Sequence, residues 1–218
     1  METKRIIFWT GFLVVIGLIV WGLVVSVNKG NRNGLENLGQ PAPVSASDHA
    51  TGPLDAPVTI IEYADFECPA CESYYYVVKQ LLSSSTVPIR LVYRNFPLPQ
   101  HTNALPAALA AEAAGLQGKY WEMHDLIFQN HADWTDLGDP KPVFVGYAKD
   151  LGLDIGRFDA DTASSGLKDF IDNQEAEGVG IGIDATPTFF LNGKAINNPP
   201  TYAEFESDIE AAASGSGR

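Results

Sequence analysis

The 218-residue sequence contains only two cysteines, Cys68 and Cys71. Small secreted domains held together by disulfides have four or more cysteines, so this class of protein is excluded. A structural zinc site normally needs four Cys or His ligands. The sequence has four histidines, but they are scattered and none has ligand spacing to the cysteine pair. We therefore expect no metal site and no other bound cofactor.

Basic residues are also scarce. The sequence has 14 Lys and Arg residues against 27 Asp and Glu residues, which gives a net charge of −13. Proteins that bind nucleic acids need clustered Lys and Arg side chains to contact the phosphates. We therefore expect no nucleic-acid partner. The hydrophobic content of 45% is that of an ordinary globular protein.

Charge is absent from a long segment near the amino terminus. Residues 6–27 contain no charged residue and no proline. As a helix, a segment of this length spans about 33 Å, enough to cross a hydrocarbon core of about 30 Å. A cleaved signal peptide would have a shorter apolar region followed by a small-residue cleavage site, and none follows here. The sequence predicts a single-pass membrane anchor over residues 1–27, with a cleaved signal peptide as the alternative.

Large apolar residues are few in the next segment, residues 28–53, which is rich in Asn, Gly, Pro, Ser and Ala. Such a composition cannot bury enough apolar surface to fold, so we predict a flexible linker. A domain over residues 54–213 and a short disordered tail over residues 214–218 complete the predicted organisation.

The chemistry of the domain centres on Cys68-Pro69-Ala70-Cys71. An apolar, β-branched strand pattern precedes this motif and a helical pattern follows it, with Pro69 suited to the first helical position. Unpaired N–H groups and the helix dipole at that end stabilise a thiolate, so the pKa of Cys68 should fall below about 8.5. Cys71 lies three residues further along the helix, close enough to form a disulfide with Cys68. The pattern predicts thiol–disulfide exchange, with Cys68 attacking and Cys71 resolving.

Glu62 interrupts the apolar strand before the motif. It stands six residues before Cys68, and therefore on the same side of an extended chain. One interpretation is a carboxylate at the strand end in contact with solvent. The other is a buried acid that accepts the proton of Cys71 during exchange.

The rest of the domain alternates between helical and strand patterns. A second strand is predicted from Pro88 to Phe96, and an inserted helical subdomain over about residues 101–178. Strand signals resume near Thr186, Asn192-Gly193 is a strong hairpin signal, and a last helix ends near Ala213. Within the insertion, helices are predicted over residues 107–116, 120–130, 143–151 and 161–177. This order predicts an α/β fold with a helical insertion.

Together, the CPAC motif after a Val-Thr-Ile-Ile-Glu strand, the helical insertion and the later Ala-Thr-Pro-Thr segment resemble the DsbA-like oxidoreductases of the thioredoxin fold. The membrane-anchored DsbA- and BdbD-like proteins are the most similar branch. The resemblance covers about residues 52–213. It implies a thioredoxin fold with Cys68 and Cys71 as the redox pair.

The resemblance also implies roles for five further residues. Pro187 matches the family's cis-proline beside the disulfide, and Thr186 would supply backbone bonds to a bound polypeptide. Pro69 and Ala70 would contact the substrate, and Glu62 matches the family's buried acid. The best-known DsbA has His where this chain has Ala70, so we expect a weaker oxidant than that enzyme.

From these features we expect an oxidoreductase that introduces disulfides into reduced or misoxidised exported polypeptides. A C-x-x-C motif behind a membrane anchor fits the oxidising, extracytoplasmic side of the cell membrane. By resemblance, a DsbB- or VKOR-like quinone-linked membrane protein would reoxidise it. The alternatives are a disulfide reductase or isomerase, and a non-catalytic module that binds a soft metal through the two thiols.

Overall fold

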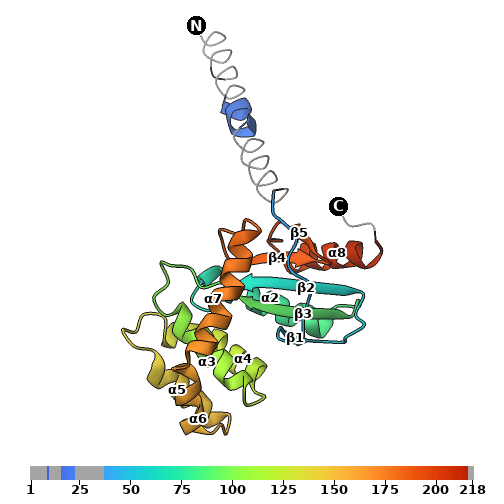
Figure 1. Cartoon of the computed structure of the whole chain (residues 1–218). Helices are drawn as coiled ribbons and strands as arrows, with labels where there is room; N and C mark the ends of the chain where they lie inside the picture. The colour runs from blue at the N-terminus through green and yellow to red at the C-terminus, as the bar shows by residue number, and fades with distance from the viewer. Residues whose placement is uncertain (1–8, 10–15, 23–36, 216–218) are drawn as a thin grey trace. The chain divides into compact units, whose positions relative to one another are not determined.

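The computed structural model describes Trp9, residues 16–22 and residues 37–215, and divides the chain into two units, Met1–Leu38 and Gly39–Arg218 (Figure 1). In the first unit, residues 16–22 are helical. Most of the predicted anchor, residues 6–27, lies outside the described residues. Among the residues that are described, no helix is both long enough and apolar enough to cross a membrane.

The second unit is built on a five-stranded mixed sheet with the order β1-β3-β2-β4-β5. The central strand β2 (Val58–Ala64) pairs parallel with β3 (Ile89–Asn95) and antiparallel with β4 (Thr188–Leu191). Six of the seven residues of β2 are buried, as expected for a strand covered on both faces. The edge strands β1 (His49–Thr51) and β5 (Lys194–Ile196) pair antiparallel with their neighbours.

Helices cover both faces of the sheet (Figure 1). On one face, α2 (Pro69–Ser84) and α8 (Tyr202–Ala213) share a core with β2 and β3. The helix α2 is amphipathic, because its buried residues Cys71, Tyr75, Val78 and Leu81 recur at helical spacing. On the other face lies α7 (Ser165–Gly180), which packs against β3.

Close packing of α7 against the sheet depends on Gly178. A β-carbon at this position would lie 2.7 Å from the Phe96 ring and 3.3 Å from the Tyr63 ring. Any other side chain would therefore push the helix away from the strands. Just after the helix, the Ile183 N–H donates to the carbonyl oxygen of Gly178.

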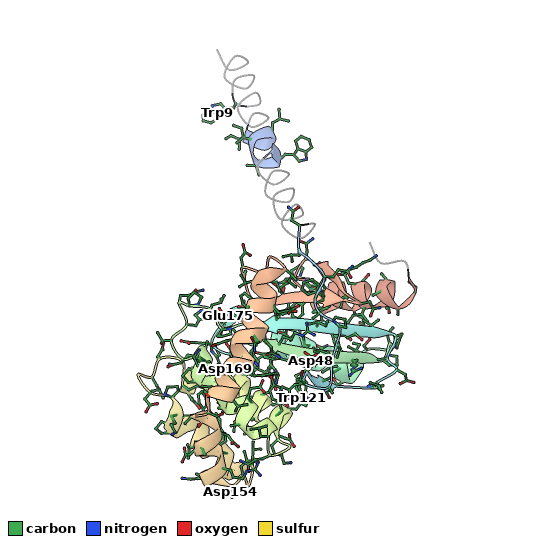
Figure 2. All side chains as sticks on the ribbon, viewed as in Figure 1. Trp9, Asp48, Trp121, Asp154, Asp169 and Glu175 are labelled. Atoms are coloured by element: carbon green, nitrogen blue, oxygen red, sulfur yellow. The ribbon has the colours of Figure 1, made fainter. Side chains whose placement is uncertain are left out.

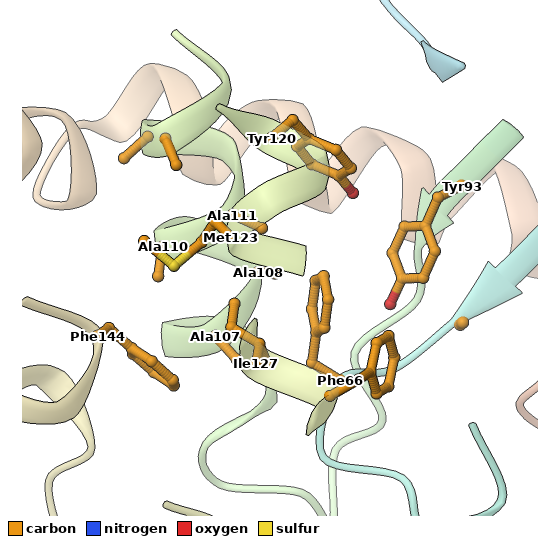
Figure 3. Close-up of a cluster of buried hydrophobic side chains, with 14 of the residues drawn as sticks. Phe66, Tyr93, Ala107, Ala108, Ala110, Ala111, Tyr120, Met123, Ile127 and Phe144 are labelled. Carbon is orange, nitrogen blue, oxygen red and sulfur yellow. The ribbon is translucent and has the colours of Figure 1, made fainter. Parts of the chain in front are cut away.

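The insertion between β3 and β4 is helical, as predicted. The alanine-rich helix α3 (Ala104–Gly115) lies at its centre and buries seven alanines (Figure 3). Its neighbours are α4 (Tyr120–Gln129), the 3₁₀ turn η1 (His131–Asp133), α5 (Lys141–Asp150) and α6 (Ile155–Thr162). The sequence did not predict α6, and the helix predicted over residues 161–177 begins later. The side chain of Ser164 caps α7 by accepting from the Gly166 N–H and so separates the two helices.

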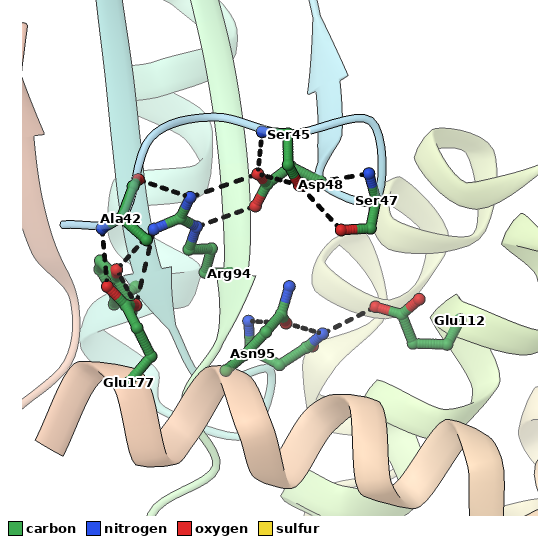
Figure 4. A network of polar contacts seen from close by, with 10 residues as sticks. Ala42, Ser45, Ser47, Asp48, Arg94, Asn95, Glu112 and Glu177 are labelled. Carbon is green, nitrogen blue, oxygen red and sulfur yellow. Dashed lines mark hydrogen bonds and ion pairs between the residues drawn. The ribbon is translucent and has the colours of Figure 1, made fainter. Parts of the chain in front are cut away.

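The predicted boundary between linker and domain is wrong. Residues 39–53 belong to the second unit, where β1 pairs with β3. Arg94 holds this segment by donating to both carboxylate oxygens of Asp48, at 2.8 and 3.2 Å, and to the carbonyl oxygen of Ala42 at 3.0 Å (Figure 4). The contacts join residues about 50 positions apart, so the composition of the segment alone could not indicate them.

The Arg94–Asp48 ion pair has side chains only 5% and 6% exposed. Replacing Arg94 by Ala would leave the carboxylate of Asp48 buried without its partner, so Arg94→Ala should lower the free energy of unfolding by about 3–5 kcal/mol. Urea denaturation would measure this change. The matched control is Lys168→Ala, which removes an ion pair about half exposed on both sides and should leave the denaturation midpoint unchanged. Equal midpoints for both variants would contradict this account.

Candidate functional site

The CPAC motif lies where β2 ends and α2 begins. Cys68 is the N-cap residue in extended conformation, and Pro69 occupies the start of the helix, as predicted. Both cysteines are free thiols, but their exposures differ: Cys68 is 7% exposed and Cys71 is fully buried. Cys68 is therefore the sulfur that an incoming thiol can reach.

The two thiols have opposite pKa shifts. A hydrogen bond from the Cys71 thiol is the main reason why the pKa of Cys68 falls to about 5, with smaller help from Thr186 and from the N–H groups of Cys71 and Ala70. Burial, and then the neighbouring Cys68, raises the pKa of Cys71 well above its usual value. At neutral pH the reduced site thus holds one thiolate and one thiol. The helix terminus contributes as the sequence predicts, but less than the partner cysteine does.

The Thr186–Pro187 peptide bond is cis, in agreement with the resemblance, and it lies against the motif. The carbonyl oxygen of Thr186 is 3.5 Å from Cys68 Sγ. A carbonyl can accept from a thiol but cannot stabilise a thiolate. The Thr186 hydroxyl is buried and has no hydrogen-bond partner among the described residues. The substrate-binding roles of Thr186, Pro69 and Ala70, and the catalytic role of Pro187 beside the disulfide, stay predictions.

Glu62 is buried, and only 4% of it is exposed, so the solvent-exposed interpretation is wrong. Burial alone raises its pKa to about 8. Its charge also disfavours the thiolate form of Cys71. At neutral pH Glu62 is mostly protonated, so it can give a proton to Cys71 as well as accept one.

Asp65 is a site residue whose setting the sequence did not indicate. It is 1% exposed, and burial raises its pKa even though three groups bind the carboxylate. These are the His101 ring at 2.7 Å and the N–H groups of Leu98 and Glu67 at 2.8 and 2.7 Å. The Asp65–His101 pair ties the CPAC loop to the segment after β3.

The helical insertion holds the same loop from the other side. The side chain of Glu67 accepts from the N–H of Asn103, and its carbonyl oxygen is 3.0 Å from His131 Nε2. The other ring nitrogen of His131 lies 3.4 Å from the carboxylate of Glu72. The sequence carried no signal for these contacts, because the partners are 36 to 64 residues apart. No cluster of three His, Cys, Asp or Glu side chains suited to a metal occurs in the described part of the chain.

Comparison with known families supports this reading of the fold. A thioredoxin family model, Thioredoxin_4, matches residues 45–211. The chain belongs to this family. Among solved structures, BdbD from Bacillus subtilis superimposes with a TM-score of 0.71 and 22% identity, over 82% of this chain and 98% of that one. Wolbachia pipientis alpha-DsbA1 has the same TM-score with 21% identity, over 80% and 95%. At these identities the likeness is one of fold.

Curated relatives match the same domain as part of longer proteins. A protein named Na(+)/H(+) antiporter NhaA 1 from Salinispora arenicola is 43% identical over 150 residues, which is 67% of this chain and 22% of that protein. One named NhaA 3 from Salinispora tropica is 42% identical over 170 residues, 76% of this chain and 24% of that protein. The chain thus spans about a quarter of the length of the curated relatives it matches.

The thiol pKa values predict a pH profile of alkylation. In the reduced protein, the rate at which Cys68 reacts with iodoacetamide should rise with a midpoint near pH 5, because the thiolate is the nucleophile. The variant Cys71→Ala loses the main hydrogen bond to the thiolate, so its midpoint should move towards about 8.5. The urea-unfolded protein is the control, because its cysteines have the ordinary cysteine pKa. A folded wild-type midpoint equal to this control would refute the assignment.

The raised pKa of Glu62 predicts an effect on stability. Between its unfolded pKa of about 4.3 and its folded pKa, the native state binds more protons than the unfolded state, so stability is lost as pH rises. Glu62→Gln removes this loss and should raise the free energy of unfolding at pH 7 by about 3 kcal/mol relative to the effect at pH 4. Parallel urea titrations at the two pH values would test this. An effect that is the same at both pH values would mean that the pKa of Glu62 does not differ between the folded and unfolded states.

Proposed function

We propose that this protein is a thiol–disulfide oxidoreductase that introduces disulfides into exported polypeptides. The observation that carries the proposal is the asymmetry of the cysteine pair, with an accessible sulfur of low pKa and a buried one of high pKa. In the oxidised protein, a substrate thiolate attacks Cys68 Sγ. A substrate–Cys68 bond forms, the Cys68–Cys71 bond breaks, and the electron pair goes to Cys71, which takes up the proton of Glu62.

A second substrate thiolate then attacks the substrate sulfur of this mixed disulfide. The substrate disulfide forms, and Cys68 leaves as a thiolate, which its low pKa makes a good leaving group at neutral pH. Relative to an unperturbed thiol, a pKa near 5 stabilises the reduced form at pH 7 by about two pKa units, or roughly 60 mV. This stabilisation of the reduced form supports the oxidising direction, even though Ala70 adds no positive charge as a His at that position would.

We place the reaction on the extracytoplasmic side of the cell membrane, with residues 6–27 as the anchor and a DsbB- or VKOR-like quinone-linked protein as the electron acceptor. The uncharged length of residues 6–27 supports the anchor. Membrane fractionation, combined with labelling of Cys68 in intact cells by a thiol reagent that cannot cross membranes, tests this location. Release of the full-length chain into the soluble fraction would rule it out.

The direction of electron flow separates this proposal from a disulfide reductase or isomerase. One solved structure of the same fold is named a protein-disulfide isomerase, from Novosphingobium aromaticivorans, with a TM-score of 0.62 and 15% identity. Equilibration with glutathione would give the reduction potential. A potential close to about −120 mV supports an oxidase, and one near −270 mV supports a reductase.

A second candidate follows from the relatives named Na(+)/H(+) antiporters, in which the matching segment is about a quarter of the protein. In that case, the domain would exchange disulfides with a membrane transporter rather than with exported polypeptides in general. The variant Cys71→Ala leaves mixed disulfides unresolved and would trap the partners in cells. Many trapped exported proteins support the first proposal, and a single trapped transporter supports the second.

Replacing the attacking sulfur gives the most direct test. Cys68→Ser should reduce the oxidative refolding of a reduced, unfolded protein to the rate without enzyme, because a hydroxyl cannot form the mixed disulfide. Recovery of activity in the refolded substrate measures the rate. Wild-type activity in the Cys68→Ser variant would contradict the proposal.

A further inference from the structure

His131 is a buried side chain that the helical insertion presents to the CPAC loop. It lies in the 3₁₀ turn η1 and is only 7% exposed. Its ring packs edge to face on Trp134, with 5.4 Å between the centroids. Trp134 is fully buried, and its Nε1 donates to the carbonyl oxygen of Ile127 at 2.9 Å. The core of the insertion therefore fixes the place of the His131 ring independently of the CPAC loop.

The ring of His131 contacts both ends of the CPAC tetrapeptide. Nε2 lies 3.0 Å from the carbonyl oxygen of Glu67, the residue before Cys68. Nδ1 lies 3.4 Å from the carboxylate of Glu72, the residue after Cys71. The Glu72 N–H donates to the carbonyl oxygen of Cys68 at 3.1 Å, so Glu72 stands one helical turn after Cys68. One side chain thus joins the two residues that flank the motif.

These two contacts determine how many protons the ring of His131 must carry. A carbonyl oxygen can only accept, so Nε2 holds a hydrogen. A neutral imidazole has no second N–H, and its Nδ1 would turn a lone pair towards the Glu72 carboxylate. The protonated ring donates on both sides and removes this repulsion. Because an imidazole is a stronger base than a carboxylate, the added proton belongs on the ring.

The negative charge of Glu72 has no other counterpart near the motif. The titratable groups from the end of β2 to the first turn of α2, together with the other one on η1, are Asp65, Glu67, Cys68, Cys71, Glu72 and Asp133. Among the residues that the structure describes, no Lys or Arg forms an ion pair with any of them. The bases bound to these groups are two histidines, His101 at Asp65 and His131 at Glu72. Without the added proton on His131, the Glu72 carboxylate would disfavour a thiolate at Cys68, one turn away.

We propose that His131 is a positioning residue for disulfide exchange: its protonated ring holds the Glu67 carbonyl, cancels the charge of Glu72 and so favours the reduced form of the CPAC site. The inference rests on the proposed function. When a substrate dithiol reduces the Cys68–Cys71 bond, two electrons enter the site and the substrate disulfide forms. Of the two substrate protons, one ends on Cys71 and the other goes to solvent, so Cys68 is left as a thiolate. With His131 protonated, this thiolate lies beside a net-neutral His131–Glu72 pair instead of a carboxylate.

The redox equilibrium with glutathione tests this role at two pH values. A histidine loses its charge between about pH 5 and pH 8, so the effect of the ring should be present at pH 6 and lost at about pH 8.5. The variant His131→Gln can still donate to the Glu67 carbonyl but leaves Glu72 charged. At a fixed glutathione ratio, it should lower the ratio of reduced to oxidised protein by about tenfold at pH 6, or roughly 30 mV. At about pH 8.5 the difference from wild type should fall below about twofold.

A second substitution separates the charge effect from a loss of packing. The double variant His131→Gln/Glu72→Gln removes the acid together with the ring, and at pH 6 its equilibrium should return to within about twofold of wild type. The control is Asp154→Ala, which removes the side chain that caps α6 at the end of the insertion away from the sheet (Figure 2). This control should lower the free energy of unfolding but leave the redox equilibrium unchanged.

Equal equilibria for wild type and His131→Gln at pH 6 would overturn the inference, and so would a loss that the double variant fails to restore. If His131→Gln did not fold, ¹⁵N NMR of the native reduced protein would decide. Both ring nitrogens of His131 should carry hydrogen at pH 6, and a lone pair on Nδ1 would contradict the assignment. A wild-type potential in the range of reductases would overturn the proposed function, whereas a tenfold loss in His131→Gln relative to that wild type would still support the role of His131.

Discussion

Of the three acidic groups around the first turns of α2, namely Cys68, Cys71 and Glu62, only one can be ionised at neutral pH. Cys71 is fully buried, Glu62 is 4% exposed, and Cys68 is 7% exposed. In such a setting ionisation of one group disfavours ionisation of the others. Cys68 is the group that ionises, because the Cys71 thiol and the N–H groups of α2 stabilise its thiolate. Burial alone keeps Glu62 neutral, and burial together with the neighbouring Cys68 keeps Cys71 neutral.

The acidic residues near the site fit the same constraint. In a chain of net charge −13, Asp65 and Glu67 flank the thiolate and would be expected to oppose it. The structure uses both as hydrogen-bond acceptors instead. Asp65 binds His101, and Glu67 binds the N–H of Asn103. These bonds hold the CPAC loop between the end of β3 and the helical insertion.

The features that could be predicted from the sequence are those whose residues lie close together along the chain. The strand, the proline at the helix start and the order of the cysteines lie within a few residues of each other, so their patterns indicated the redox pair and the α/β fold with a helical insertion. The position of Glu62 followed from strand periodicity, but its burial depends on α4, and the cis form of Pro187 came only from resemblance. The strand β1, the Arg94–Asp48 pair and the His101–Asp65 contact join distant residues. No local pattern contains them.

The absence of a side chain at Gly178 has a mechanical consequence. Because α7 touches the rings of Tyr63 and Phe96 there, the helix and the strands cannot slide past each other without a clash. Gly178 and Pro187 are only nine positions apart, and the bond from the Ile183 N–H to the Gly178 carbonyl shortens that path further. The last turn of α7 therefore fixes the point from which the chain runs to Thr186, whose carbonyl oxygen lies 3.5 Å from Cys68 Sγ.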